Sequence, residues 1–284
     1  MVRKEKLKKP FRLFTFVIGF LLCCYPLVSG IVGHRNQQNL ISTYGDKLKE
    51  QDETKIQEAL KSAEKYNSVL YQTMGAMVGN SSDILGEDNY KKLLDLTETG
   101  IMGSIEIPKI NVDLPIYHGT SDEVLSKGVG HVMDSSLPIG GKSTRSILTG
   151  HRGLPTAKLF TRLDEMDKGD FFFVNVCNQT LAYQVTKIEE IKPEDVDKLN
   201  IEADKDLVSL ITCTPYGLNT HRLVITGERV EYDEKQKQEI QSQMMSPREL
   251  IFTVLPFVFL AVFIYMILKE RKESKSKYES KKEN

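Results

Sequence analysis

The stretch that decides the fold of this chain is LVSLITCTPYGLNTHRLVITGER, residues 207–229. A run of β-branched and apolar residues ends at a single cysteine, Cys213, after which Pro215 and Gly217 predict a turn. A second strand is expected to begin at Arg222. A hairpin-like return of the chain would therefore bring Arg222 back beside Cys213.

The pairing of a thiol with a guanidinium permits two interpretations. A positive charge favours the thiolate, which is the reactive form of cysteine, so Cys213 can act as a nucleophile. Arg222 can also stabilise the oxyanion of a tetrahedral intermediate. A buried structural cysteine beside a surface arginine that forms a salt bridge fits the same spacing, and the spacing alone favours this second interpretation.

The region after Gly103 has the pattern of short β-strands bounded by Gly, Pro, Asn or Asp. Strands are expected at residues 104–107, 113–117, 146–149, 170–176, 181–190, 207–212 and 222–230, and short helices in the connections 121–126, 156–163 and 193–198. This density of short strands predicts a mainly β fold with a closed or nearly closed barrel.

The part that precedes the barrel is predicted to be helical. Residues 39–72 carry apolar side chains at every third or fourth position between polar ones, which is typical of an amphipathic surface helix. Gly45 and a break that contains Asp52 are the positions at which this helix is expected to divide. Residues 75–87, GAMVGNSSDILGE, have the composition of a loop, and residues 89–96 are expected to form a short helix.

Two uncharged hydrophobic stretches, residues 13–32 and 250–268, are each long enough to cross a bilayer core of about 30 Å as a helix. A cleaved signal peptide is the alternative for the first stretch, but its apolar region is longer than a usual signal core, which favours an uncleaved anchor. Basic residues precede the first stretch and follow the second, so the positive-inside rule puts both termini in the cytoplasm. Residues 33–248 would then face the outside.

The composition and the motifs argue against several classes of function. The formal net charge is −1, so neither sign dominates and nucleic acid is not an expected partner. The sequence has no H-E-x-x-H motif, no paired C-x-x-C and no glycine-rich phosphate loop, so no metal and no cofactor are expected. The acidic pairs Asp122-Glu123 and Asp164-Glu165 are expected to be solvated surface.

The use of cysteine indicates a functional thiol. Cys23 and Cys24 lie within the first hydrophobic stretch, so only Cys177 and Cys213 remain outside it. A disulfide between these two is the alternative, and it is disfavoured because Cys177 lies beside a hairpin turn predicted at residues 178–179. An isolated cysteine in an exported domain that has no disulfide framework points to a chemical role.

The hairpin and a second segment together resemble a known family. Residues 209–213, SLITC, followed nine residues later by Arg222, resemble the T-L-x-T-C…R signature of sortases. Residues 149–153, TGHRG, match the segment that carries the catalytic histidine of that family. The strings IGGKSTRSILTGHRGLPTAKLF and CTPYGLNTHRL are most similar to class C sortases, which assemble pili in Gram-positive bacteria. The resemblance implies an eight-stranded sortase-like β-barrel with N-terminal helices and short connecting helices, flanked by two transmembrane helices.

This resemblance and the hydrophobic pattern divide the chain into seven parts. They are a cytoplasmic basic tail (1–12), a transmembrane signal-anchor helix (13–32), a helical region with a lid-like loop (33–100), the catalytic barrel (101–232), a juxtamembrane linker (233–249), a second transmembrane helix (250–268) and a second cytoplasmic basic tail (269–284). The expected location is the cell membrane, in contact with lipid, with the catalytic domain outside the cell.

Five histidines compete for the role of acid and base: His34, His118, His131, His151 and His221. His34 abuts the membrane, and His221 is expected to point away from the strand face that carries the arginine. The residues by themselves leave His151 and His131 open. The family pattern selects His151, and His131 is then expected to be structural or to lie in the outer cleft.

The resemblance implies a cysteine transpeptidase whose chemistry is like that of a cysteine protease. Its substrates would be secreted pilins that carry a C-terminal LPxTG-type sorting signal. Cys213 would attack the carbonyl between Thr and Gly to form a thioacyl-enzyme, His151 would protonate the departing amine, and Arg222 would stabilise the oxyanion or hold the substrate backbone. A lysine amine of the next pilin would resolve the intermediate as an isopeptide bond.

The surroundings of this trio are assigned by the same resemblance. Thr212, Thr214 and Tyr216 are expected to line the substrate cleft, with scaffold packing as the alternative. Class C sortases usually carry a lid before the barrel with an Asp-Pro-aromatic anchor, whereas here no aromatic residue follows Asp83. Either Asp83 and Ile84 form a degenerate lid or the lid does not plug the site, and we expect a loosely held lid.

Two other functions remain open. A housekeeping-type sortase would attach surface proteins to the cell wall instead of polymerising pilins, although the second hydrophobic stretch and the GHRGLPTAKLF string favour the pilus class. An inactive membrane-tethered scaffold would keep the barrel without the chemistry. The joint presence of Cys213, His151 and Arg222 argues against the scaffold.

Overall fold

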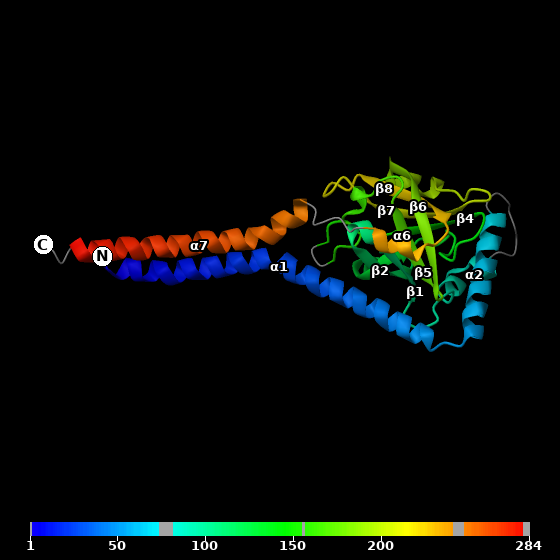
Figure 1. Ribbon diagram of the computed structural model, residues 1–284, viewed down its shortest axis with the longest axis horizontal. Helices are drawn as coiled ribbons and strands as arrows, with labels where there is room; N and C mark the ends of the chain where they lie inside the picture. Colours follow the sequence, from blue (N-terminus) through cyan, green and yellow to red (C-terminus); the bar gives the residue numbers. More distant parts are fainter. Residues whose placement is uncertain (1, 74–81, 155–156, 241–246, 281–284) are drawn as a thin grey trace. The chain divides into compact units, whose positions relative to one another are not determined.

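The computed structural model describes residues 2–73, 82–154, 157–240 and 247–280 of the chain. The chain falls into two units: residues 33–243 form one, and residues 1–32 together with 244–284 form the other. The larger unit contains the barrel, and the smaller unit contains the two hydrophobic stretches (Figure 1).

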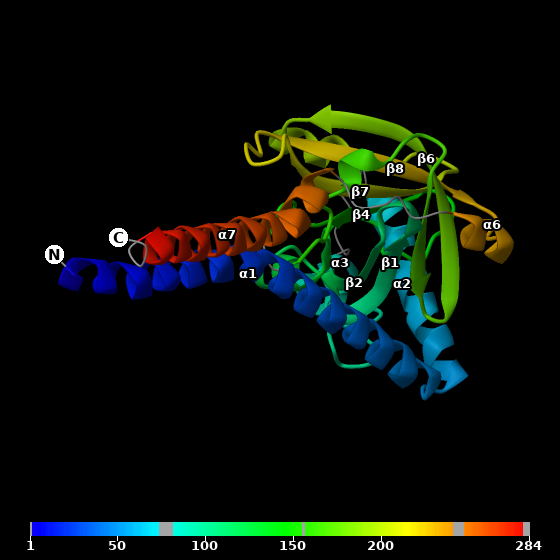
Figure 2. The same cartoon turned by 60° about the vertical axis from the view of Figure 1, so that its left-hand side comes forward.

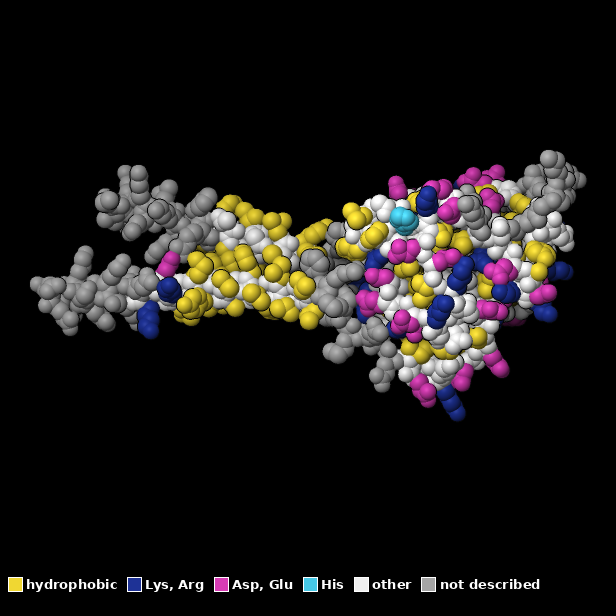
Figure 3. All heavy atoms as spheres, turned by 90° about the horizontal axis from the view of Figure 1, so that it is seen from above, with side chains coloured by type: hydrophobic (Ala, Val, Ile, Leu, Met, Phe, Trp, Pro, Cys, Tyr) yellow, Lys and Arg dark blue, Asp and Glu magenta, His cyan; other side chains and the backbone are white. Residues whose placement is uncertain are grey.

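The smaller unit consists of the first part of α1 (Val2–Lys49) and of α7 (Pro247–Ser280). Each helix holds a segment that is long and apolar enough to cross a membrane, Leu13–Lys49 and Thr253–Lys272, and an 18-residue window within each has a mean hydropathy of 2.2 and 1.9, respectively. Apolar side chains cover much of the surface of the pair (Figure 3). A helix needs such a surface to lie in the hydrocarbon core of a bilayer.

These two helices pack against each other through aromatic residues. The ring of Phe16 in α1 stacks on the rings of Phe259 and Phe263 in α7, with centroid distances of 5.1 and 3.5 Å. Gly19 leaves room for this contact, since a Cβ atom there would lie 3.3 Å from the ring of Phe259. Pro256 lies inside α7 without ending it, as is tolerated in membrane helices.

The predicted division of the amino-terminal helix is confirmed at Asp52 and not at Gly45, because α1 continues through Gly45 and α2 (Glu53–Thr73) begins after Asp52. The carboxylate of Asp52 accepts a hydrogen bond of 3.1 Å from the N–H of Thr54. Asp52 therefore caps α2 by satisfying one of the N–H groups that have no partner within the helix. The buried side of α2 is the predicted one and includes Ile56, Leu60, Ala63, Tyr66 and Leu70.

Eight strands of the described chain form a closed barrel in the order β1-β2-β3-β4-β7-β8-β6-β5 (Figure 2). They are β1 (Ile101–Ile107), β2 (Val112–His118), β3 (Val129–His131), β4 (Thr144–Thr149), β5 (Phe171–Val176), β6 (Gln179–Ile191), β7 (Asp206–Thr214) and β8 (His221–Val230). The predicted mainly β fold with an eight-stranded barrel is confirmed. Most neighbours are antiparallel, but β3 pairs with β2, and β7 with β4, in parallel.

The sequence pattern did not predict β3. This strand has only three residues, one of which is Gly130, so it shows neither alternation nor enrichment in β-branched residues. Its place is set by the neighbours on either side: Tyr117 of β2 and Thr149 of β4 both pair with Gly130. A Cβ atom on Gly130 would lie 2.4 Å from the carbonyl oxygen of Gly119, so this position requires glycine.

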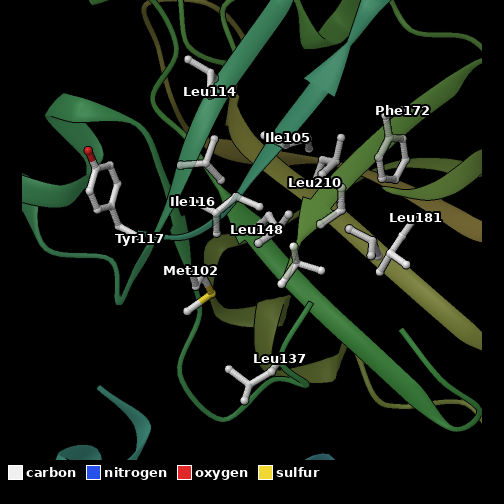
Figure 4. Close-up of a cluster of buried hydrophobic side chains, with 14 of the residues drawn as sticks. Met102, Ile105, Leu114, Ile116, Tyr117, Leu137, Leu148, Phe172, Leu181 and Leu210 are labelled. Atoms are coloured by element: carbon white, nitrogen blue, oxygen red, sulfur yellow. The ribbon is translucent and has the colours of Figure 1, made fainter. Parts of the chain in front are cut away.

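Both faces of β7 are buried, which explains its nearly continuous apolar sequence. Val208 and Leu210 pack into the main apolar core, part of which Figure 4 shows. Ile211 lies on the opposite face and packs against Ile147 and Val224 in a second, smaller cluster. Each fully buried large apolar side chain contributes about 1.5–3 kcal/mol. The strand that ends in the predicted nucleophile is therefore firmly held.

The connections follow the prediction only in part. Helical turns are found as predicted at α5 (Asp122–Lys127) and at the 3-10 segment η3 (Pro193–Lys198). The helix predicted over residues 156–163 is wrong for residues 157–163: turns lead into a 3-10 segment, η2 (Leu163–Glu165), and Leu159 has a φ of 39°, which a right-handed helix does not accommodate. The other short elements are α3 (Ser82–Leu85), α4 (Glu87–Tyr90), η1 (Pro108–Ile110) and α6 (Glu234–Glu239).

Candidate active site

Cys213 and Arg222 lie opposite each other at the loop end of the β7–β8 hairpin. Cys213 pairs with Arg222 in the antiparallel register, between the pairs Thr212–Leu223 and Thr214–His221. Directly opposite residues of such a ladder project to the same face, with Cβ atoms about 4.5–5.5 Å apart. The juxtaposition predicted from the sequence is therefore found in the strand register, and Cys213 is a free, half-buried thiol.

His151 reaches the same end of the barrel from β4. Because β4 and β7 run parallel, with Thr149 paired to Ile211, both strands end in the same direction. The N–H of Gly150 donates a hydrogen bond of 3.1 Å to the carbonyl oxygen of Ile211, which continues the ladder by one residue. His151 follows immediately and is half-buried. Three neighbouring strands thus bring together the residues predicted as acid–base, nucleophile and oxyanion partner.

The loop that carries His151 is fixed on both sides. The carbonyl oxygen of His151 accepts a hydrogen bond of 3.1 Å from the N–H of Phe160, and the N–H of Gly153 donates one of 3.0 Å to the hydroxyl of Thr161. Gly153 has a φ of +80°, and a Cβ atom there would lie 3.0 Å from the ring of Tyr216. This backbone geometry and close contact both require glycine. His151 and Gly153 are therefore held in place by groups outside the trio.

The guanidinium of Arg222 lies against the β7–β8 loop. Its Nη1 donates hydrogen bonds to the carbonyl oxygens of Asn219 and His221, at 3.3 and 3.1 Å. These two carbonyls hold the head of a half-buried side chain at the rim of the site. A guanidinium has five N–H donors, so this arrangement leaves donors for a substrate oxygen.

The three residues predicted to line the cleft differ in exposure. Thr212 is buried, and its hydroxyl donates a hydrogen bond of 2.8 Å to the carbonyl oxygen of Gly150. Thr214 is also buried, and its hydroxyl contacts Glu190 at 3.4 Å. Both hydroxyls serve the framework, which corresponds to the scaffold alternative. Tyr216 is 45% exposed and is the one of the three that presents a large surface to a ligand.

Arg152 and Asp164 are residues of this site that the sequence reasoning did not assign. Asp164 is exposed, as expected, but its carboxylate forms a salt bridge with the guanidinium of Arg152 that the sequence did not predict. Glu165 likewise pairs with Arg162, at 2.7 Å. Two features of the sequence could have indicated this salt bridge. Arg152 directly follows the predicted catalytic histidine, and the acidic pair Asp164-Glu165 follows after a connection of about the length of a loop. Which carboxylate would meet which arginine depends on the course of that loop.

His131 and His118 are structural and lie outside the trio. His131 is fully buried; its Nδ1 lies 2.9 Å from the hydroxyl of Tyr90 and its Nε2 lies 2.9 Å from the carbonyl oxygen of Ser136. Burial lowers the pKa of His131 to about 4. His118 is half-buried, with Nε2 2.7 Å from the carbonyl oxygen of Leu93, and burial lowers its pKa as well. Both histidines connect the segment around α4 to β2 and β3.

The remaining cysteines and acidic residues offer no second site in the described part of the chain. Cys177 is buried in the β5–β6 turn and is free, and burial raises its pKa to about 11. Its thiol is therefore kept protonated at neutral pH and is unreactive. Among the described residues, no group of three or more His, Cys, Asp or Glu side chains is arranged to hold a metal ion.

The predicted lid falls partly on α3. The side chain of Asp83 lies outside the described residues. Ile84 is partly buried and packs against the main apolar core, as does Leu85. The carbonyl oxygen of Ile84 accepts a hydrogen bond of 2.7 Å from the side-chain amide of Asn89. Ile84 is thus attached to the body of the larger unit through both apolar contact and a hydrogen bond.

Comparison with known proteins identifies relatives of this fold and site. The sequence model of the family described as "Sortase domain" matches residues 105–230. Sortase D of Bacillus subtilis is 35% identical over 137 residues, which are 47% of this chain and 66% of that protein. Sortase A of Bacillus anthracis is 25% identical over 231 residues, which are 81% of this chain and 97% of that protein.

Two solved structures extend this likeness to the fold. The crystal structure of sortase C1 from Streptococcus agalactiae is 44% identical, with a TM-score of 0.63, and the match covers 69% of this chain and 100% of that one. The structure of Clostridium perfringens sortase C with the C-terminal cell wall sorting motif is 38% identical, with a TM-score of 0.58, and the match covers 68% of this chain and 99% of that one.

Proposed function

Because this chain belongs to the sortase family of cysteine transpeptidases, with class C sortases as structural neighbours, we propose that it polymerises pilins by way of their LPxTG-type sorting signals. The observation that supports this proposal most strongly is the pairing of Cys213 with Arg222 at the end of β7, next to the end of the parallel strand β4 that leads into His151. Nucleophile, acid–base group and cation lie on three adjacent strands. An inactive scaffold would have no need of this combination.

The first half of the reaction cleaves the sorting signal. The thiolate of Cys213 attacks the carbonyl carbon of the bond between Thr and Gly, and Arg222 donates hydrogen bonds to the oxygen on which negative charge develops. As the C–N bond breaks, His151 gives a proton to the departing amine of Gly. The products are a thioacyl-enzyme, in which the Thr carbonyl is bonded to sulfur, and a free amine.

The second half joins two pilins. The amine of a lysine on the next pilin loses a proton to His151 and attacks the thioester carbon. The C–S bond breaks, an isopeptide bond forms, and the thiolate of Cys213 is restored. One acyl bond is exchanged for another, so the proposal needs neither ATP nor a cofactor. We assign Tyr216 to the wall of the substrate cleft, because it is exposed beside the loop of His151.

Two observations support the pilus class. The likeness to sortase C1 of Streptococcus agalactiae spans the whole of that structure at 44% identity, and a second relative of class C was solved with a cell wall sorting motif. The housekeeping alternative, attachment of surface proteins to the cell wall, is favoured by the matches to two sortases A, of Bacillus anthracis and Listeria monocytogenes, which span 81–84% of this chain at 25–26% identity. The higher identity makes pilin polymerisation the first candidate.

We further propose that the protein is anchored in the cell membrane by residues 13–32 and 250–268, with both basic tails in the cytoplasm and the barrel outside. The two apolar helices and the basic residues at their outer ends support this topology. The seven parts inferred from the sequence fit this topology. An exported barrel would meet secreted pilins in a compartment without ATP, and the proposed chemistry does not require it.

The proposed function is tested with the full-length protein in detergent micelles. Wild type and Cys213→Ala are each incubated with a purified pilin that carries an LPxTG signal, and the products are separated on a denaturing gel. A heat-stable ladder made only by the wild type is the expected result. Cleavage of an LPxTG peptide that depends on Cys213, without a ladder, would favour the housekeeping alternative. Absence of both activities would contradict the transpeptidase proposal for these residues.

A further inference from the structure

Arg152 is a buried cation at the centre of the site. It directly follows His151, yet its side chain is only 3% exposed, whereas the loop around it is half-buried. The guanidinium passes beneath the ring of Tyr216, with its carbon 5.7 Å from the ring centroid. A buried guanidinium is costly unless it is paired and hydrogen-bonded. Its partners therefore indicate what the residue is there to do.

These partners include the nucleophile itself. Nη1 of Arg152 donates hydrogen bonds to the carbonyl oxygen of Cys213 at 3.3 Å and to the hydroxyl of Thr214 at 3.4 Å. Nη2 forms a salt bridge with the carboxylate of Asp164, whose side chain is 32% exposed. The two Nη groups of the guanidinium thus bind different partners. One end contacts the backbone of β7, and the other is oriented by a carboxylate from the loop that follows His151.

One donor of Arg152 is left without a partner. Its Nε–H is buried and has no hydrogen-bond partner among the described residues. An unsatisfied buried donor is unfavourable, and such groups are rare in native structures. The orientation of the guanidinium is therefore set by the bonds of its two Nη groups at the expense of Nε. The Nε of Arg145, which lies away from the site, is likewise buried without a partner, so the case for Arg152 rests on where its Nη groups bind.

The strand ladder alone does not fix His151 relative to Cys213. The last described links between β4 and β7 are the bonds of Gly150 to Ile211 and of Thr212 to Gly150, and both come before His151. Consecutive Cα atoms are about 3.8 Å apart, so an anchor on Arg152 restricts the position of His151 directly. The bond from Arg152 to the carbonyl of Cys213 closes this gap.

We propose that Arg152 is a positioning residue: its hydrogen bond to the main-chain carbonyl of Cys213, oriented by Asp164, holds His151 at working distance from the thiol. The inference rests on the proposed roles of Cys213 and His151. It explains why the cation is buried beneath the site and not aimed at the substrate. Misplacement of catalytic groups by about 1 Å costs on the order of 10²-fold in rate, so loss of this anchor should be felt in the chemical step.

The test uses full-length protein in detergent micelles, with Arg152→Met, Arg152→Lys, Asp164→Asn and the double variant Arg152→Met/Asp164→Asn. Arg145→Met is the matched control. Arg145 is also buried and paired with a carboxylate, Glu202 at 2.6 Å, and it lies on β4 at the end away from His151. Each variant is measured for thermal unfolding, for cleavage of an LPxTG peptide, and for the rate at which iodoacetamide alkylates Cys213 as a function of pH.

The expected result for Arg152→Met is a fall of about 10²-fold in kcat per folded enzyme with little change in KM, because the chemical step and not substrate binding loses its geometry. Asp164→Asn should lose about tenfold, since a neutral amide still accepts one hydrogen bond but no longer pairs with the charge. The double variant should be no worse than Arg152→Met, because both changes break one network. Arg152→Lys should recover only part of the loss, because a single ammonium cannot reproduce the fork.

The alkylation profile separates positioning from stability. Arg152→Met should shift the pH profile of alkylation to that of His151→Ala, since in both cases the imidazole no longer lies beside the thiol. Arg145→Met should lower the unfolding temperature and keep the wild-type pH profile. An Arg152→Met enzyme with the wild-type profile, or one whose loss of kcat per folded enzyme is no greater than that of Arg145→Met, would overturn the proposal.

Failure of the proposed function can be told apart from failure of this inference. Alkylation needs no sorting signal, so the effect of Arg152 on the thiol can be measured even if the wild type makes no pilin ladder. A missing ladder together with a shifted alkylation profile in Arg152→Met would overturn the pilin proposal and support the positioning role.

Discussion

The hydroxyl of Thr212 donates a hydrogen bond of 2.8 Å to the carbonyl oxygen of Gly150. This bond joins the residue before Cys213 to the residue before His151, across two parallel strands. Both Thr212 and Gly150 are buried, so water cannot replace the bond. The end of β4 that leads to His151 and the end of β7 that carries Cys213 are therefore joined by a buried side chain that does not face the substrate.

Replacement of this threonine tests that link. Thr212→Val keeps the branched shape but leaves the carbonyl of Gly150 buried without a partner, and we expect the free energy of unfolding to fall by about 1–3 kcal/mol. Peptide cleavage should fall as well, because the two strand ends lose their register. Urea denaturation and the kcat for an LPxTG peptide measure the two effects. Thr212→Ser, which restores the hydroxyl, should recover most of both, and equal losses in the two variants would contradict this account.

The role of Arg222 is tested against its neighbour. Arg222→Lys retains the charge but removes the planar fork, and removal of an oxyanion donor typically costs 10²–10³-fold, so we expect about a 10²-fold loss of kcat/KM. His221→Ala is the control, because His221 is the adjacent residue on the other face of β8 and pairs with Thr214. It should stay within about twofold of wild type. Equal effects of the two changes would show that the hairpin, and not the guanidinium, is what matters.

The contact between Gly153 and Tyr216 gives a prediction with an internal control. Gly153→Ala combines a positive φ of +80° with a Cβ that would lie 3.0 Å from the ring of Tyr216. Gly217→Ala has a φ of +81° but nothing within 4 Å of the added Cβ. Backbone strain alone should cost about 1–2 kcal/mol in both variants. Only Gly153→Ala should also lower peptide cleavage, because Tyr216 and the loop of His151 must move apart.

The pH dependence of stability should reveal His131. Its pKa is lowered by burial to about 4 in the folded chain, against about 6.5 when unfolded. The unfolded state therefore binds more protons between these values, and this group removes stability as the pH falls from about 6.5 to 4, by up to about 3 kcal/mol. Asp113 acts in the opposite direction, because burial raises its pKa to about 6, so the folded state takes up a proton earlier than the unfolded state does.

The opposing contributions of His131 and Asp113 to the pH dependence of stability can be separated by substitution. His131→Gln, which can keep hydrogen bonds to Tyr90 and Ser136, should be less sensitive to acid than wild type between pH 6.5 and 4. Asp113→Asn should be more sensitive over the same interval. Urea denaturation at a series of pH values measures both slopes. Parallel pH curves for His131→Gln and wild type would mean that His131 is not kept neutral by burial.

The loosely held lid remains a prediction. Ile84 packs against the apolar core, so its truncation would confuse stability with gating, and Asp83→Ala is the sharper change. If the lid is loosely held, Asp83→Ala should alter peptide cleavage by less than about twofold. A large rise in activity would show instead that this residue plugs the site. Thermal unfolding of the variant serves as the control for an indirect effect.

The sequence by itself determined the elements whose signals are local. The alternation in residues 207–229 and the turn at Pro215 and Gly217 define a hairpin, and hairpin geometry alone places Cys213 opposite Arg222. The spacing of apolar residues predicted the buried face of α2, and Asp52 marked its start. These features depend on the period of a strand or a helix and on caps and turns, which involve neighbouring residues only.

Only the tertiary structure decided which distant segments meet. The strand β3 exists because β2 and β4 lie on either side of it, and its three residues carry no period of their own. Arg152 meets Asp164 across the segment that follows His151, and the parallel pairing of β4 with β7 brings the hydroxyl of Thr212 to the carbonyl oxygen of Gly150. The physical reason is that such contacts form between residues far apart in the chain. They depend on the closure of long loops and on burial of the residues against one another, and the sequence of a single segment determines neither.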